Sequence, residues 1–322
     1  MIQSGAEELL RSLLAVALAS VVLPAWAEPP RVVTDIAAVH SLVSRVMEGV
    51  GEPELLIPAG ASPHFYALKP SDARKLRDAQ IVIKIGPQLS PWMDRPLTSL
   101  AQGAQRLRLL EQPGTITLAA RTGATFEPHE HHGDHHPGTG EEDHDHDHDH
   151  GHAAIDPHAW LDPENGKIWL PLIAKALSDL DPEHAADYSA NATAGAAEID
   201  WAMADTRAAL ASVQDLRFIV FHDAYQYFEH RFGLNAAGAI ALSDASPPGP
   251  ARIAELRERV EALDVTCALT EPQFDLDLVR TVFDSHDIKT AVVDPAGSAL
   301  PLGPDMYPEL IRSVGAALTS CN

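Results

Sequence analysis

Three histidines lie in surroundings that are typical of a metal site. His64 follows Pro63 in a loop that leaves the apolar run Leu55-Leu56-Ile57, and His222 ends the apolar run that starts at Phe218. Both side chains therefore come at the carboxyl ends of predicted strands, where ligands bind in open α/β sheets. His158 stands in a proline-stiffened segment just before a predicted helix. We expect these three imidazoles to be metal ligands.

Three neutral imidazoles suit Zn²⁺, which prefers nitrogen and sulfur donors in four-coordinate geometry. The same donors also bind Cu²⁺ and Ni²⁺, and the sequence leaves these two ions open. Each metal-bound imidazole should donate its other N–H to an acceptor nearby in the fold. Asp223 and Glu271 are the candidates for these acceptors.

A second group of histidines forms a continuous tract. Between residues 127 and 152 the chain carries ten histidines and nine acidic residues, and no Lys or Arg occurs from Thr122 to Gly166. With so little apolar surface to bury, the segment should be a solvated loop that offers a dense set of metal donors. We interpret it as an accessory site that concentrates Zn²⁺, although a sensing or docking role stays open. Its histidines are His129, His131, His132, His135, His136, His144, His146, His148, His150 and His152.

The first 27 residues have the features of a cleaved secretory signal peptide. An apolar run from Leu13 to Leu23 is followed by Ala25-Trp26-Ala27, which fits a small-x-small cleavage site. The run is too short to span a bilayer. We therefore expect residues 28–322 to form a soluble protein exported to the periplasm.

The only two cysteines, Cys267 and Cys321, should form a disulfide, because an isolated pair of thiols in an exported protein usually does. Such a bridge would contribute roughly 4 kcal/mol in the chain-entropy model. Two thiolate metal ligands are the alternative.

The formal net charge of −23 argues against nucleic acid or an anionic membrane surface as a partner and suits a cationic ligand. The mature chain, residues 28–322, is longer than a single hydrophobic core usually organises, so we expect two lobes.

Short apolar runs alternate with helical stretches along the chain, which indicates βαβ units and parallel sheets. The predicted strands cover residues 31–36, 54–57, 81–86, 217–221, 265–269 and 290–293. The predicted helices cover residues 37–49, 71–79 with Ser71 as N-cap, 164–180 and 250–263.

Residues 182–213 show a longer helical pattern than the rest of the chain. At about 1.5 Å per residue this helix would run about 45 Å, long enough to cross a two-lobed molecule. Two helices broken near Gly195 are the alternative. The side chains that recur at helical spacing are Tyr188, Ala192, Ala196, Ile199, Met203, Leu210 and Val213.

Together, these motifs resemble the metal-specific (cluster A-I) solute-binding proteins of ABC importers, and most closely the zinc-uptake proteins of the ZnuA type. The resemblance covers nearly the whole mature chain, and the histidine tract lies where ZnuA-like proteins carry theirs. The motifs, in family order, are Gly60-Ala61-Ser62-Pro63-His64, Pro157-His158-Ala159-Trp160-Leu161, Phe221-His222-Asp223-Ala224-Tyr225, Glu271-Pro272-Gln273-Phe274 and Asp294-Pro295-Ala296-Gly297.

The resemblance implies an α/β fold with two βα lobes, each built on a parallel sheet, joined by a long rigid helix with the metal in the cleft between them. The expected division is an N-terminal lobe at 28–181, a connecting helix at 182–213 and a C-terminal lobe at 214–322. The tract at 127–152 would be a loop of the N-terminal lobe.

By motif match, His64 and His158 would come from the first lobe and His222 from the second. Manganese-binding relatives tend to have a carboxylate at the position of His222, so this residue favours zinc. The fourth position would be filled by Asp294 or by water. The resemblance further implies that the protein delivers Zn²⁺ to a membrane permease with its cytoplasmic ATPase. We also expect a monomer that is no enzyme.

Two other functions compete with transport. Three histidines with an open position are also the ligand set of a catalytic zinc that activates water. The sequence contains neither a His-Glu-x-x-His pair nor a Gly-x-Ser-x-Gly elbow, which argues against a metallohydrolase. A periplasmic zinc buffer or storage protein, acting mainly through the tract, is the second alternative; storage alone would not require a three-histidine cleft.

Overall fold

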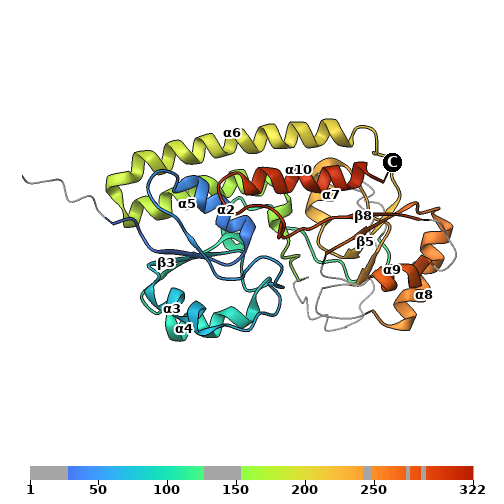
Figure 1. Ribbon diagram of the computed structural model, residues 1–322, viewed down its shortest axis with the longest axis horizontal. Coiled ribbons are helices and arrows are strands. Elements are labelled where there is room, and N and C mark those ends of the chain that lie inside the picture. The colour runs from blue at the N-terminus through green and yellow to red at the C-terminus, as the bar shows by residue number, and fades with distance from the viewer. Residues whose placement is uncertain (1–27, 127–153, 242–247, 273–275, 284–287, 322) are drawn as a thin grey trace, which may run out of the picture.

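The computed structural model describes residues 28–126, 154–241, 248–272, 276–283 and 288–321. The predicted signal peptide and the histidine tract, with all ten of its histidines, lie outside the described residues. Two βα lobes lie side by side beneath a long helix (Figure 1).

The N-terminal lobe is built on a four-stranded parallel sheet in the order β2-β1-β3-β4. The two central strands are buried throughout, as expected of a parallel sheet that is covered on both faces. Its elements are β1 (Val32–Thr34), α2 (Ala37–Val46), β2 (Glu54–Leu55), α3 (Pro70–Asp78), β3 (Ile81–Lys84), α4 (Asp94–Leu100) and β4 (Gln105–Arg108).

The C-terminal lobe repeats this topology with its own parallel sheet, in the order β6-β5-β7-β8. In both lobes the first strand along the chain pairs with the second on one side and with the third on the other. The elements are β5 (Phe218–His222), α7 (Gln226–Phe232), β6 (Ala239–Ala241), α8 (Pro250–Ala262), β7 (Cys267–Thr270), α9 (Leu276–Phe283) and β8 (Lys289–Val292).

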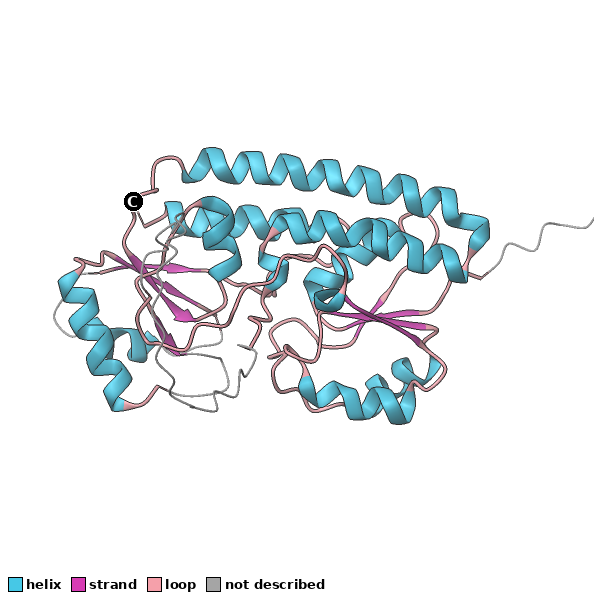
Figure 2. Ribbon diagram, turned by 180° about the vertical axis from the view of Figure 1, so that it is seen from behind, coloured by secondary structure: helices cyan, strands magenta, loops and turns pink. Residues whose placement is uncertain are grey.

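One continuous helix, α6 (Ala185–Leu210), spans both lobes (Figure 2). Its 26 residues correspond to about 39 Å. The helix is not broken at Gly195. Glycine stands there because neighbouring side chains leave no room for a Cβ. A Cβ there would lie 2.8 Å from Cγ of Arg45 and 3.1 Å from a methyl group of Leu170 on α5 (Pro163–Leu180). The prediction of a single long helix is confirmed.

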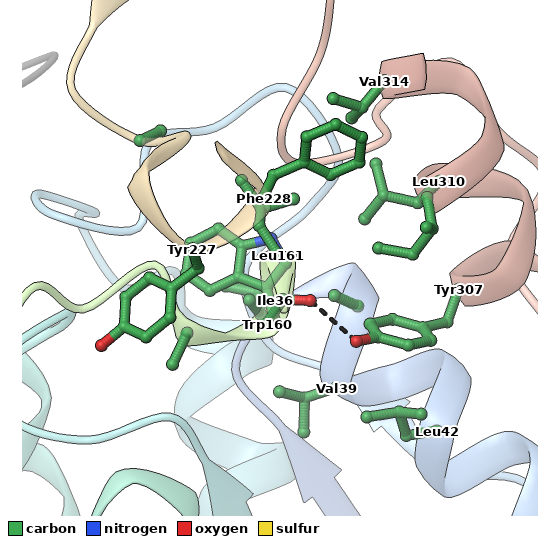
Figure 3. Packing of buried hydrophobic residues seen from close by; sticks show 14 of the residues in the cluster. Ile36, Val39, Leu42, Trp160, Leu161, Tyr227, Phe228, Tyr307, Leu310 and Val314 are labelled. Atoms are coloured by element: carbon green, nitrogen blue, oxygen red, sulfur yellow. Dashed lines mark hydrogen bonds between the residues drawn. The ribbon is translucent and has the colours of Figure 1, made fainter. Parts of the chain in front are cut away.

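One hydrophobic cluster extends through both lobes, beside a smaller cluster on each sheet. The cluster includes Ile83 of the first sheet and Leu269 of the second, with helix α10 (Met306–Thr319) between α6 and α2. Figure 3 shows Tyr307 of α10 reaching Trp160, whose carbonyl oxygen accepts a hydrogen bond of 2.8 Å from the tyrosine hydroxyl. The chain thus returns from the C-terminal sheet to fasten both lobes to the long helix.

The prediction of Ser71 as N-cap is wrong. Helix α3 begins at Pro70, whose missing N–H needs no partner in the first turn, and Lys69 occupies the N-cap position. Asp72 closes the first turn, because its Oδ2 accepts a hydrogen bond of 2.9 Å from the Lys69 amide. All six predicted strands and four shorter predicted helices have counterparts, with ends that differ by a few residues. Strands β4 and β6 and helices α4, α7, α9 and α10 were not predicted.

A disulfide joins Cys267 at the start of β7 to Cys321 after α10, with their Cα atoms 5.8 Å apart. This confirms the predicted bridge and removes the alternative of two thiolate ligands. None of the helices in the described part of the chain is long and apolar enough to span a membrane.

Candidate metal centre

The three singled-out histidines meet between the two lobes. One donor atom from each of His64, His158 and His222 lies within 4.8 Å of the others. The ring of His158 stands in the middle, with its centroid 5.3 Å from that of His64 and 5.3 Å from that of His222. Two sequence segments from the first lobe and one from the second thus converge on a single point.

His222 is the last residue of β5 and is buried. Its Nδ1 lies 2.5 Å from Oε1 of Glu271, which follows the neighbouring strand β7 and is also buried. A carboxylate on Nδ1 holds the proton there and leaves the Nε2 lone pair for a metal. Glu271, one of the two predicted acceptors, thus contacts Nδ1 of His222, and its role behind a bound metal stays a prediction.

His158 is held in the same way by a residue that was not predicted. Its Nδ1 lies 2.8 Å from Oδ1 of Asp156, which also accepts a hydrogen bond of 2.9 Å from the His158 amide. Burial raises the pKa of Asp156 to about 7. The Asp-Pro-His spacing carried this signal, because an Asp two residues before a His can bond both its amide and its ring.

His64 lies on a loop and is only half-buried. The structure fixes the backbone before it: the carbonyl oxygen of Pro63 accepts hydrogen bonds from Ser90 Oγ at 3.0 Å and from Trp92 Nε1 at 2.9 Å. Ser62 Oγ accepts a further bond of 3.2 Å from the His64 amide. Neither Ser90 nor Trp92 was predicted, because both lie far from His64 in sequence.

Asp294 lines the same pocket, but it is not a member of the group of donor atoms formed by the histidines. Its carboxylate closes its own loop: Oδ1 accepts from the Ala296 amide at 2.9 Å, and Oδ2 accepts from the Ser298 amide at 2.5 Å. Asp223, predicted as an acceptor behind a ligand, pairs with Arg121 instead.

The pocket between the three imidazoles has a volume of about 50 Å³. Sites for organic ligands usually enclose about 300–1,000 Å³, so this one has room for an ion with a few water molecules rather than for an organic ligand. Two nitrogens bound at about 2.0–2.1 Å to a tetrahedral zinc lie about 3.4 Å apart. The donor atoms of the three histidines lie within 4.8 Å of one another, so each pair needs to approach by no more than about 1.4 Å. The residues present therefore fit Zn²⁺. The lining residues include His64, His158, Trp160, His222, Asp294 and Pro295.

Residues 32–321 match the family model of ZnuA, described as zinc-uptake complex component A, periplasmic. The chain belongs to this zinc-uptake family. The high-affinity zinc uptake system protein ZnuA of Brucella abortus (strain 2308) is 43% identical over 303 residues, covering 90% of this chain and 91% of that relative. The protein of the same name from Paracoccus denitrificans (strain Pd 1222) is 43% identical over 314 residues, covering 96% of both.

Among solved structures, the solute-binding protein FpvC from Pseudomonas aeruginosa, in complex with Mn²⁺, has a TM-score of 0.72 at 23% identity. The match covers 92% of this chain and 100% of that chain. At this identity the likeness shows the fold alone, and it confirms the predicted architecture of two parallel-sheet lobes with a long helix. Members of the zinc-uptake family are transport components; the absence of catalysis in this chain stays a prediction.

Proposed function

We propose that this protein is a periplasmic solute-binding protein that captures Zn²⁺ with high affinity and delivers it to an ABC importer. The observation that carries the proposal is the cluster of three histidines in a pocket too small for an organic ligand. Membership of the zinc-uptake family supports it independently.

In this proposal His64, His158 and His222 bind the ion through one nitrogen each. Asp156 and Glu271 lie on the Nδ1 atoms of the two buried histidines, which supports a role in orienting them. The fourth ligand is water or Asp294. The bonds from the loop of Asp294 to both of its oxygens favour water, because a carboxylate that closes its own loop would have to give up these bonds to reach the ion.

The metal follows from the ligand types. Three neutral nitrogens suit Zn²⁺, whereas a harder ion such as Mn²⁺ is better served by carboxylates. The ion is the cargo of this protein, so it must bind tightly and still be released at the membrane. We propose a permease and its ATPase as the partners that receive it, a monomeric state, and cleavage of residues 1–27 on export.

Calorimetric titration of the metal-free mature protein with Zn²⁺, beside a variant that lacks residues 129–152, tests this function. The proposal expects one tight site in both proteins, with weaker additional sites only in the mature protein that retains the tract. Loss of the tight site on deletion would mean that the tract is the main site, and the protein would then be a zinc buffer.

A further inference from the structure

Behind the two buried histidines, a strap of the first lobe is bound to the second lobe. The segment 118–126, which we call the strap, leaves the first lobe and passes along α7. Its Phe126 amide donates to the Ala237 carbonyl oxygen at 3.0 Å, and Thr125 forms an antiparallel bridge with Gly238 beside β6. The strap therefore joins the sheet of the other lobe at its edge strand.

The same strap also carries the backbone of the His158 segment. The Asp156 amide donates to the Leu118 carbonyl oxygen at 2.9 Å, and the Ala120 amide donates to the Ala154 carbonyl oxygen at 2.7 Å. The contacts that hold the strap on the second lobe therefore also hold Asp156, and with it the ring of His158.

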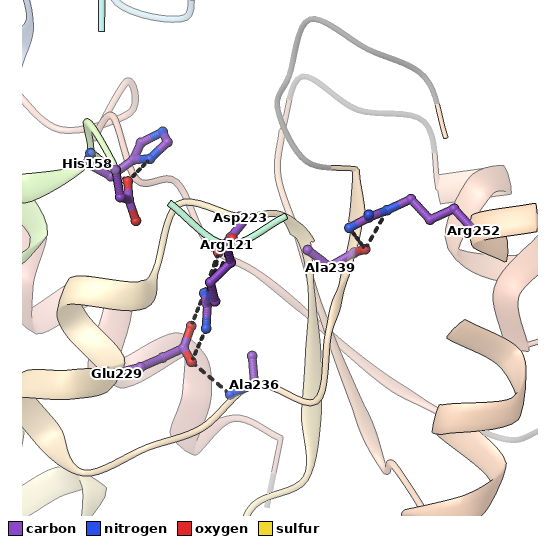
Figure 4. A network of polar contacts seen from close by, with 8 residues as sticks. Arg121, His158, Asp223, Glu229, Ala236, Ala239 and Arg252 are labelled. Carbon is purple, nitrogen blue, oxygen red and sulfur yellow. Dashed lines mark hydrogen bonds and ion pairs between the residues drawn. The ribbon is translucent and has the colours of Figure 1, made fainter. Parts of the chain in front are cut away.

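Arg121 makes the strap's charged connection to the second lobe. Its Nε donates to both oxygens of Asp223 at 3.0 and 3.1 Å, and its two terminal nitrogens donate to the two oxygens of Glu229 at 3.1 and 2.9 Å. Figure 4 shows its guanidinium between these two carboxylates. The side chains of both acids are 5% exposed and that of Arg121 is 13% exposed, so this charge cluster is shielded from water. Asp223 is the residue directly after His222.

Helix α7 adds a second connection at the same place. With its nitrogen toward two acceptors, the amide of Gln226 donates to Asp156 Oδ2 at 3.0 Å and to the Ala119 carbonyl oxygen at 3.1 Å. The hydroxyl of Tyr227 donates to the Asp156 carbonyl oxygen at 2.8 Å and accepts from the Leu118 amide at 3.0 Å. A path thus runs from His158 through Asp156 and the strap to Arg121 and, by its ion pair, to Asp223, which is the chain neighbour of His222.

We propose that Arg121 is a positioning residue of the metal site, which sets the distance between His158 and His222 across the two lobes. The proposal rests on the proposed zinc-binding function of these histidines. The planar fork of arginine can serve two carboxylates at fixed angles, whereas the point charge of a lysine cannot. Arg121 touches neither imidazole, so its effect on the metal passes through Asp223 and the strap.

The test compares Arg121→Lys with a matched control, Arg231→Lys. Arg231 on α7 also makes a partly buried ion pair across the lobes, with its Nε and a terminal nitrogen 2.7 and 2.8 Å from the carboxylate of Asp162. This pair serves the start of α5, because Asp162 is the N-cap of that helix. For both variants and the wild type, the Zn²⁺ dissociation constant, the visible spectrum of the Co²⁺ complex and the thermal midpoint of the metal-free protein are measured.

Arg121→Lys should raise the Zn²⁺ dissociation constant by about 10–100-fold, the usual cost of a change behind a metal ligand, and should alter the Co²⁺ ligand-field bands. Arg231→Lys should lower the thermal midpoint about as much as Arg121→Lys does. The Zn²⁺ dissociation constant of Arg231→Lys should nevertheless stay within about twofold of the wild type, because Arg231 touches no group on this path. Gln226→Leu, which breaks the second connection and keeps the arginine, should change the Co²⁺ bands in the same direction as Arg121→Lys.

A wild-type dissociation constant and an unchanged Co²⁺ spectrum in Arg121→Lys would overturn the positioning role. An equal loss of affinity in Arg231→Lys would also overturn it, because the effect would then be general loosening of the lobes. Absence of a tight site in the wild type would instead contradict the proposed function, so the two failures are distinguishable.

Discussion

The rim and the floor of the metal pocket differ in burial and in the contacts that hold them. On the floor, the two buried histidines have their rings fixed by carboxylates, Glu271 behind His222 and Asp156 behind His158. On the rim, half-buried His64 is held through the backbone, by two hydrogen bonds to the carbonyl oxygen of the preceding proline. The floor is oriented before the ion arrives, whereas His64 is the partly exposed member of the three.

This difference suits a protein that must both capture and release its cargo. Preorganised donors lower the cost of binding, because their rotamer freedom is already lost in the metal-free protein. A partly exposed rim ligand can be replaced by water first when the ion leaves. We therefore expect changes on the floor to lower affinity most, and changes on the rim to act mainly on the rate of dissociation.

Removal of a floor ligand should have the largest effect. His222→Ala deletes a donor that the fold and Glu271 hold in place. It should raise the Zn²⁺ dissociation constant more than about 100-fold, which exceeds the usual cost of a change behind a metal ligand. His230→Ala is the control, since this side chain is exposed on α7. Competition titration against a chelator measures both variants. Equal affinities would exclude His222 as a ligand.

Acidification should act on all three ligands together. Imidazole binds metal only when neutral, so protons compete below its ordinary pKa of roughly 6.5, and affinity falls as the pH falls. For each imidazole that must lose a proton, the loss approaches about tenfold per pH unit below that value. Chelator competition at pH 7.5, 6.5 and 5.5 would check this. A flat affinity over this range would count against a site made of histidines.

Neutralising a floor carboxylate should have an intermediate effect. Glu271→Gln keeps an acceptor near His222 Nδ1 but removes the charge that strengthens the bond, so affinity should fall about tenfold. Glu111→Gln, at a partly exposed acid in the other lobe, serves as the control and should leave affinity unchanged. Calorimetry at constant pH measures the Zn²⁺ affinity of both variants. If Glu271→Gln bound Zn²⁺ as tightly as the wild type, this carboxylate would not orient the floor.

Loosening the rim should have the smallest effect. Trp92→Phe keeps an aromatic ring but removes one of the two donors to the Pro63 carbonyl oxygen, worth about 1 kcal/mol or about fivefold. We expect this factor mainly in the dissociation rate of Zn²⁺, measured by stopped-flow transfer to a chelator. Trp201→Phe, at an exposed tryptophan on α6, is the matched control. If Trp92→Phe weakened binding more than Glu271→Gln did, the contrast between rim and floor would be wrong.

The strand-end histidines show what could be predicted from the sequence. His64 and His222 were placed near a site because strand ends of parallel sheets share an edge, and the structure brings both to His158. The contacts between distant segments could not be predicted in this way. Arg121 meets Asp223 across 102 residues, and no local pattern marks such a pair. Strand β6 is only three residues long and alternates alanine with one isoleucine, which is too short for a periodic signal.

The central claim is that the tight zinc site is the three-histidine pocket between the lobes. Its most direct test is anomalous diffraction at the zinc edge from crystals loaded with one equivalent of Zn²⁺. We expect a single strong peak about 2.0–2.1 Å from one nitrogen each of His64, His158 and His222. A dominant peak elsewhere, or one bound by fewer than two of these histidines, would contradict the account.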